Sequence, residues 1–142
     1  MLVLDTDVLS LVQTSRSPEA HRLLDRIRTS GELACATIVT FQEQMRGRLA
    51  QCAKATNPDQ YVLAARQLHL TYQDYRDRTI LDFDEAAAAE FRRLTAVKVR
   101  ISTMDLRIAS TVLVHDVTLI TMNRRDHERV PGLRVEDWTA PA

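Results

Sequence analysis

Glycine, proline and cysteine are scarce in this chain of 142 residues, which contains three, four and two of them. Such low glycine and proline contents exclude a collagen-like repeat or a low-complexity linker and favour a compact, helix-rich chain. Cys35 and Cys52 form no Cys-x-x-Cys motif, and the chain shows neither a signal peptide nor an apolar run of membrane-spanning length. We therefore expect one soluble domain over residues 1–142, located in the reducing cytoplasm and without a membrane partner.

Lysine is also rare, because only Lys54 and Lys98 accompany 17 arginines, and 19 acidic side chains balance the 19 basic ones. The formal net charge of zero excludes a global positive field that would attract nucleic acid or membranes without specificity. Arginine is nevertheless the better bidentate ligand of phosphate. Recognition of a phosphate-rich substrate must therefore depend on local groups of arginines.

Short apolar runs alternate along the chain with helical periodicity. The runs are typical of buried strands and lie at residues 2–4, 33–36, 79–81, 117–121 and 133–135. Helical stripes span residues 20–27, 61–75, 87–94 and 108–113, and the first two follow the start signals Ser17-Pro18 and Asn57-Pro58. This alternation predicts a three-layer α/β fold with a central, mostly parallel sheet of four or five strands.

The stretch from Gly47 to Arg78 is almost entirely helical in pattern. We expect it to form a helical hairpin set against the sheet. Its apolar stripe contains Tyr61, Tyr72 and Tyr75, and such a stripe faces either the core, which is the commoner use, or a partner.

The first seven residues place two carboxylates directly after an apolar run. Leu2-Val3-Leu4 predicts a strand that is buried on both faces, and Asp5 follows it. Ligands of open α/β sheets bind beyond the carboxyl ends of the strands, so Asp5 would lie at the edge of such a site. Alternatively, Asp5, Thr6 or Asp7 caps a helix that begins near Val8.

A second acid, Asp105, falls on the apolar face that Ile108, Ala109 and Val112 define. A carboxylate on the buried side of a helix is unfavourable unless a partner compensates its charge. Ser102 and Asp105 also have capping-box spacing, so a purely structural role remains the alternative.

Glu43 and Asp126 complete a set of four acids at transitions from strand to helix. Thr40 and Glu43 again match a capping box. Asp126 follows the strand at 117–121 in a short charged turn, where a solvated loop is the alternative interpretation. Because the four acids recur where sites form at the sheet edge, they are candidates for one shared site.

These segments carry a family resemblance. The chain resembles a PIN-domain protein, specifically a VapC-type toxin ribonuclease of a bacterial toxin–antitoxin pair. The matching segments follow one another in order: residues 2–10 with Asp5-Thr6-Asp7, residues 40–47 with Glu43, residues 105–110 with the Asp-x-x-Ile-Ala pattern, and residues 119–126 followed by 130–138. The pattern departs at His127, which replaces an aromatic residue, and some PIN proteins have their fourth acid where Asn123 stands here.

The resemblance implies a metal-dependent endoribonuclease in which Asp5, Glu43, Asp105 and Asp126 are the catalytic acids. Asp5 and Asp105 would be direct metal ligands, and Glu43 and Asp126 would bind through water, hold a second ion or orient the nucleophile. Clustered carboxylates need a nearby positive charge, and oxygen ligands without Cys or His partners favour Mg²⁺ or Mn²⁺, which activates water for attack on phosphate. Supporting roles are expected for Thr6, Asp7, Thr121 and Asn123, whereas no catalytic role is expected for the four histidines.

Several arginines flank the proposed ligands. Possible contacts to RNA phosphates are Arg46, Arg48, Arg124, Arg125 and Arg129, although a solvated charged surface is the default role of any single one. The resemblance also implies a homodimer and a VapB-like antitoxin that covers the acidic groove and presents an arginine to its carboxylates.

Two alternatives from other classes stay open. An apolar strand followed by Asp-x-Asp also resembles haloacid-dehalogenase-type phosphatases and phosphotransferases, in which Asp5 would be the nucleophile and Asp7 the acid/base. Such enzymes need a downstream lysine, for which Lys98 is the candidate. In the second alternative, the chain is a non-catalytic binding module whose acids cap helices.

Overall fold

The apolar run at the start of the chain forms β1 (Leu2–Leu4), the middle strand of a five-stranded parallel sheet within residues 1–141, which the computed structural model describes. The elements that follow are α1 (Thr6–Thr14), α2 (Pro18–Ser30), β2 (Ala34–Thr37), α3 (Ile38–Lys54), α4 (Pro58–Asp77), β3 (Ile80–Leu81), α5 (Glu85–Ala96), α6 (Thr103–His115), β4 (Thr118–Ile120), α7 (Arg124–His127) and β5 (Arg134–Glu136). The predicted α/β class, the parallel sheet and the position of every predicted strand are confirmed.

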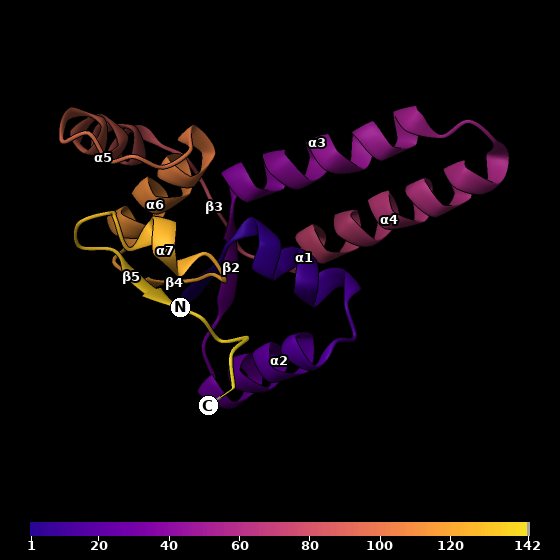
Figure 1. Cartoon of the computed structure of the whole chain (residues 1–142), viewed down its shortest axis with the longest axis horizontal. Coiled ribbons are helices and arrows are strands. Elements are labelled where there is room, and N and C mark those ends of the chain that lie inside the picture. Colours follow the sequence, from indigo (N-terminus) through magenta and orange to yellow (C-terminus); the bar gives the residue numbers. More distant parts are fainter. Residues whose placement is uncertain (142) are drawn as a thin grey trace.

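The side chains of β1 point alternately to the two faces of the sheet, as expected for a strand that is buried on both sides. Leu4 packs with Leu9 of α1 in one core, and Val3 packs with Ile108 of α6 in another. Helix α5 covers α6 through a third core that contains Leu94. The fold is therefore layered, with helices on both faces of the sheet (Figure 1).

The strand order β3-β2-β1-β4-β5 creates a switch point beside β1. The chain proceeds from β1 to β2 and β3 on one side, and β4 and β5 lie on the other side. In parallel α/β sheets, the connections that leave neighbouring strands diverge at such a point and open a crevice at their carboxyl ends. This is the position that Asp5, at the end of β1, and Thr121, at the end of β4, occupy.

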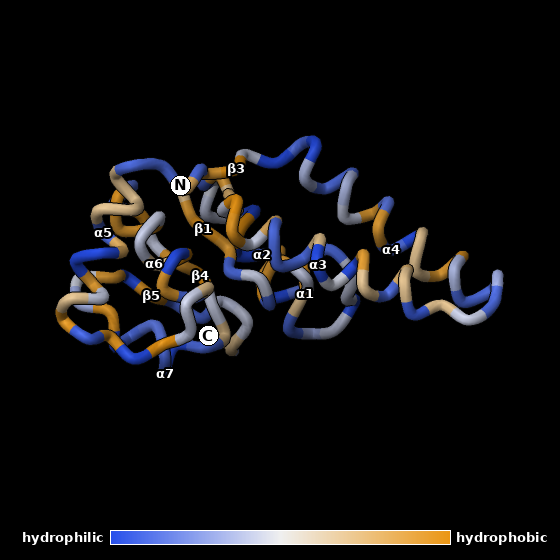
Figure 2. The backbone as a smooth tube through the Cα atoms, turned by 90° about the horizontal axis from the view of Figure 1, so that it is seen from above, coloured by the Kyte–Doolittle hydropathy of each residue, from blue (hydrophilic) through white to orange (hydrophobic). Residues whose placement is uncertain are grey.

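The predicted helical hairpin exists as α3 and α4, but most of it does not lie against the sheet. Figure 1 shows the two helices projecting beyond the sheet, with their connection at the far end. Tyr75, near the end of α4, is buried in the core, whereas Tyr61 and Tyr72 are 54% and 56% exposed. Orange apolar positions on the projecting part of α4 are visible in Figure 2. Of the two uses that the sequence left open for these tyrosines, the core therefore holds for Tyr75, whereas Tyr61 and Tyr72 lie on the exposed surface of the projecting hairpin.

A polar network fixes the base of this hairpin. The Tyr75 hydroxyl donates to Oε1 of Gln44 at 2.7 Å, and Nε2 of Gln44 donates to Ser10 and to Gln13 of α1. These bonds join α1, α3 and α4 and hold the start of α3, which carries Glu43, beside the start of α1. Within residues 1–141, no helix combines the length and apolar character that crossing a membrane requires.

Candidate active site

A small acidic cavity lies at the switch point of the sheet. Its volume is about 110 Å³, and its walls are formed by Asp5, Thr6, Asp7, Glu43, Asp105, Asn123 and His127. Pockets for small molecules usually measure about 300–1,000 Å³. The cavity therefore suits an ion, water and a phosphate group at its mouth better than an enclosed small molecule.

Asp5 serves both as a helix cap and as part of this cavity. Its Oδ1 accepts a hydrogen bond from the Val8 backbone at 3.0 Å, which caps α1, and its Oδ2 accepts from the Thr121 hydroxyl. The residue is only 6% exposed, and burial raises the pKa of its carboxyl from 3.8 to about 6, against the lowering effect of both hydrogen bonds. Burial therefore makes the charge of Asp5 less favourable than that of an exposed aspartate, and a cation nearby would stabilise it.

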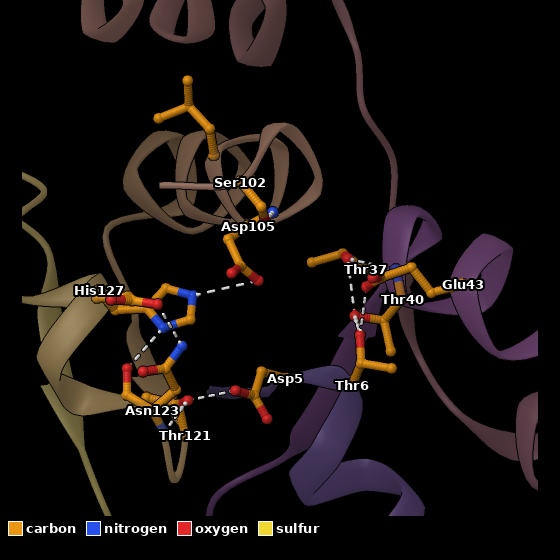
Figure 3. A network of polar contacts seen from close by, with 12 residues as sticks. Asp5, Thr6, Thr37, Thr40, Glu43, Ser102, Asp105, Thr121, Asn123 and His127 are labelled. Carbon is orange, nitrogen blue, oxygen red and sulfur yellow. Dashed lines mark hydrogen bonds and ion pairs between the residues drawn. The ribbon is translucent and has the colours of Figure 1, made fainter. Parts of the chain in front are cut away.

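Asp105 lies in the first turn of α6 with its carboxylate free for the cavity. Ser102 caps this helix, since its Oγ accepts from the Asp105 backbone at 3.1 Å. The Asp105 side chain extends toward the His127 ring, and its Oδ1 lies 3.8 Å from Nε2 of His127 (Figure 3). The cap therefore uses the backbone of Asp105 and leaves its carboxylate available.

Glu43 is not the capping residue that its spacing from Thr40 suggests. The cap of α3 is Thr37, whose hydroxyl accepts from the Thr40 backbone at 3.1 Å, so α3 begins at Ile38 and Glu43 lies in its second turn. Oε1 of Glu43 accepts from the Thr6 hydroxyl at 2.5 Å. The capping alternative for Glu43 is wrong, and the side chain instead faces the start of α1.

Asp126 stands behind the cavity rather than in its wall. It accepts a hydrogen bond from Nδ2 of Asn123 at 3.0 Å and lies 3.7 Å from Arg129. The Asn123 hydrogen bond, more than the neighbouring positive charges, holds the pKa of Asp126 below its usual range. Asn123 itself lines the cavity, and Asp126 holds its side-chain amide.

His127 is the cavity residue that sequence reasoning missed. It is 1% exposed, its Nδ1 lies 3.0 Å from the Asn123 carbonyl oxygen, and its Nε2 faces Asp105. No catalytic role was expected for the four histidines, yet His127 lines the cavity and faces Asp105. The signal was present in the sequence, because His127 follows a candidate acid and replaces the aromatic residue of the resembled pattern.

The predicted phosphate-contacting arginines occupy different environments. Arg46 is exposed and lines a groove of about 800 Å³ together with Arg107, which the sequence prediction did not include. Arg48 instead donates to Thr71 of α4 at 3.0 Å and joins the two helices of the hairpin. Arg125 is exposed, Arg124 pairs with Glu128 at 2.7 Å, and Arg129 also donates to the Arg100 carbonyl at 3.0 Å. Arg46 is thus better placed for a phosphate than Arg48.

Comparison with known proteins assigns this arrangement to a family. The family model described as "PIN domain" matches residues 2–133, which include the whole cavity. The chain belongs to the PIN-domain family.

Individual relatives match over nearly their whole length. The tRNA(fMet)-specific endonuclease VapC of Salmonella typhimurium is 25% identical over 142 residues, covering 97% of this chain and 99% of the relative. Ribonuclease VapC2 of Haemophilus influenzae is 27% identical over 141 residues, covering 96% of each chain. The crystal structure of DNA-bound VapBC from Salmonella typhimurium is similar in fold, with a TM-score of 0.77, 23% identity and coverage of 96% of this chain and 97% of that chain.

The PIN-domain geometry removes most support from the two alternatives. A phosphatase built on Asp5 needs a lysine near that carboxylate, but the cavity wall formed by residues 1–141 contains none, and Lys98 lies in the turn after α5. A module with merely capping acids is also disfavoured, because the caps of α3 and α6 are the hydroxyls of Thr37 and Ser102. Among these three acids, only Asp5 caps a helix with its side chain, and it does so through Oδ1 alone, since Oδ2 accepts from Thr121.

The donor set of this PIN domain fits a hard divalent cation. Within residues 1–141, no group of three or more His, Cys, Asp or Glu side chains is arranged so that it could hold a metal ion. Mg²⁺, however, keeps several waters and is usually bound through one or two carboxylates. Asp5 and Asp105 supply two carboxylates from opposite walls, and the raised pKa of Asp5 shows that this cavity disfavours a carboxylate without a compensating charge.

Proposed function

We propose that this PIN-domain protein is the toxin of a VapBC-type toxin–antitoxin pair, an endoribonuclease that depends on Mg²⁺ or Mn²⁺. The observation that carries the proposal is the acidic cavity at the switch point, which Asp5, Asp7, Glu43 and Asp105 line. VapC-type PIN nucleases generally require a divalent metal. The choice between magnesium and manganese is part of the proposal.

Most residues in and around the cavity have a defined task in this function. Asp5 and Asp105 hold the cation, and Thr121 keeps Asp5 in place through its hydroxyl. When bound, the cation lowers the pKa of water and offsets the charge that develops on the scissile phosphate. Glu43, fixed by Thr6, orients the attacking water or accepts its proton, and Asn123 offers an amide to the substrate.

Substrate phosphates approach from the mouth of the cavity. Arg46 and Arg107 line the neighbouring groove on α3 and α6, and their guanidinium groups offset the repulsion between RNA and the acidic wall. The balanced net charge supports selective rather than broad RNA cleavage. Since two relatives are named as endonucleases specific for tRNA(fMet), initiator tRNA is the first substrate to test.

The proposed partner is a VapB-like antitoxin that covers the cavity and offers an arginine to its carboxylates. The similar fold of a VapBC complex supports this partner. Homodimerisation and a cytoplasmic location remain parts of the proposal that derive from the family, and the free thiols of Cys35 and Cys52 agree with a reducing compartment.

Expression in a bacterial host that lacks the antitoxin tests the function. The unmodified protein should arrest growth and generate new RNA 5′ ends, and Asp5→Asn should abolish both effects. The matched control is Asp84→Asn, because Asp84 caps α5 as Asp5 caps α1 and asparagine caps as well as aspartate. Asp84→Asn should still arrest growth. If Asp5→Asn arrests growth as well, Asp5 acts only as a helix cap and the proposal is overturned.

A further inference from the structure

The ring of His127 is held so that one nitrogen faces the acidic cavity. Nδ1 lies 3.0 Å from the backbone carbonyl oxygen of Asn123. Since a carbonyl oxygen only accepts, Nδ1 must carry the proton of this hydrogen bond. In the neutral imidazole, the Nε2 atom then has a free lone pair.

This lone pair accepts no hydrogen bond from the described residues, and the carboxylate that it faces is that of Asp105. The His127 side chain is 1% exposed, and Nε2 is a buried nitrogen that makes no hydrogen bond in residues 1–141. Buried polar atoms almost always find a partner, so an unpaired one facing a cavity indicates that something else binds there. Figure 3 shows this nitrogen directed toward Asp105 from the opposite wall.

The distance between the two walls suits a shared cation. Nε2 of His127 lies 3.8 Å from Oδ1 of Asp105, which is too far for a hydrogen bond. Two donor atoms that each lie about 2.1 Å from one cation are separated by at most about 4.2 Å. A histidine that binds a metal also almost always donates its other ring N–H to a carbonyl or carboxylate, as His127 does to Asn123.

We propose that Nε2 of His127 is, together with Asp105, a direct ligand of the divalent cation, an inference that rests on the proposed function. The site then has one nitrogen and several oxygen donors instead of oxygens alone. Imidazole suits transition metals, whereas Mg²⁺ strongly prefers oxygen ligands. The site of this protein therefore selects Mn²⁺ over Mg²⁺, and His127, in place of an aromatic residue, is the cause.

Isotope labelling tests the nitrogen ligand in the unmodified protein. Bound Mn²⁺ is paramagnetic, so pulsed electron paramagnetic resonance detects a directly coordinated nitrogen through its modulation of the spin echo. We expect a ¹⁴N modulation that changes to the ¹⁵N pattern when only histidine is ¹⁵N-labelled. Because this comparison needs no substitution, it remains decisive even if a His127 variant does not fold.

Two variants assign the signal to one of the four histidines. His127→Phe should remove the nitrogen modulation, and His21→Phe, which alters an exposed ring on α2, should retain it. Titration calorimetry should show that His127→Phe weakens Mn²⁺ binding by at least about tenfold and lowers the preference for Mn²⁺ over Mg²⁺.

The outcomes separate this inference from the function on which it rests. In one outcome, Mn²⁺ binds to the unmodified protein, Asp105→Asn abolishes this binding, and the spectrum shows no histidine nitrogen. This outcome overturns the ligand assignment and leaves the nuclease proposal intact. Equal Mn²⁺ affinity in folded His127→Phe and unmodified protein overturns it as well. Absent Mn²⁺ binding, or binding that both Asp5→Asn and Asp105→Asn leave unchanged, overturns the metal-dependent function and the inference together.

Discussion

The hydroxyl of Thr121, at the end of β4, donates a hydrogen bond to the carboxylate of Asp5, at the end of the neighbouring strand β1. The Thr121 oxygen also accepts from the backbone N–H of Asn123 at 2.9 Å. One side chain thus connects the first acid of the site to the loop that presents Asn123 and His127. These groups are brought together by the pairing of β1 with β4, which joins segments from opposite ends of the chain.

Replacement of Thr121 by valine tests this connection. The isosteric change leaves an oxygen of Asp5 and the Asn123 N–H without a buried partner, so we expect a loss of about 1–3 kcal/mol in the free energy of unfolding. We also expect weaker Mn²⁺ binding, measured by calorimetry, because Asp5 loses its orientation. Thr118→Val, on the same strand, is the control and should change neither quantity appreciably. Unaltered metal affinity in a folded Thr121→Val protein would contradict the positioning role.

The raised pKa of Asp5 predicts a pH-dependent stability in the absence of metal. Because the folded-state pKa is about 6 and the ordinary value is 3.8, protonated Asp5 stabilises the fold below about pH 4, and this stabilisation is lost as the pH rises through 6. The loss is about 3 kcal/mol at most. In EDTA, Asp5→Asn should therefore gain stability relative to the unmodified protein between pH 4 and pH 7.5, as measured by chemical denaturation.

Added Mn²⁺ is the internal control of that experiment. At pH 7.5 it should raise the Tm of the unmodified protein and leave the Tm of Asp5→Asn almost unchanged, since the cation compensates the buried carboxylate. A constant stability difference between the two proteins from pH 4 to pH 7.5 would show that burial does not disfavour the charge of Asp5.

Glu43→Gln should separate chemistry from stability. Glu43 does not cap α3, so the variant should unfold at nearly the same temperature while RNA cleavage falls by orders of magnitude. Glu19→Gln, at an exposed position of α2, is the matched control for loss of one acid. Full cleavage by Glu43→Gln would remove Glu43 from the catalytic set.

Asp126 and Asn123 should differ in effect because only Asn123 lines the cavity. We expect Asn123→Ala to reduce cleavage strongly and Asp126→Asn to reduce it less than Asp105→Asn does. Full activity of Asp126→Asn would leave Asn123 or Asp7 as the fourth residue of the site. A loss in Asp126→Asn as large as that in Asp105→Asn would contradict the positioning role and make Asp126 a direct participant.

Tyr75→Phe tests the polar base of the helical hairpin. The change leaves Oε1 of Gln44 buried without its donor, which should lower the free energy of unfolding by about 1–3 kcal/mol. Tyr72→Phe, at an exposed ring on the same helix, should have little effect in the same denaturation experiment. Equal stability of the two variants would show that the network is not needed to hold the hairpin.

The strands were predictable because a parallel sheet buried on both faces leaves continuous apolar runs in the sequence. Asp5 and Asp105 were predictable as site candidates for the same local reason, since each interrupts an apolar pattern. The first residue of α3, the helix that carries Glu43, was not predictable from the sequence, because both Thr37 and Thr40 are good N-cap residues. Pairing of Thr37 with Leu81 extends β2 and makes Thr37 the cap, and this pairing is a long-range event.

The position of His127 and the exposure of the hairpin depend on tertiary contacts. Periodicity identifies the helix of Tyr61 and Tyr75, but it does not show where the sheet ends and the hairpin projects into solvent. Likewise, His127 enters the site only because α7 lies beside the start of α6, a relation that no local pattern expresses. The sequence signals for this residue were its place after a candidate acid and its departure from the family pattern.

Cleavage of RNA by the purified protein is the most direct test of the central claim. The account predicts that cellular RNA, with initiator tRNA included, is cut at defined positions in Mn²⁺ or Mg²⁺, and that EDTA stops the reaction. It also predicts that Asp5→Asn and Asp105→Asn, purified identically and shown to be folded, leave the same RNA intact. Cleavage that persists in EDTA, cleavage by both variants, or a phosphoaspartate trapped at Asp5 would contradict the account.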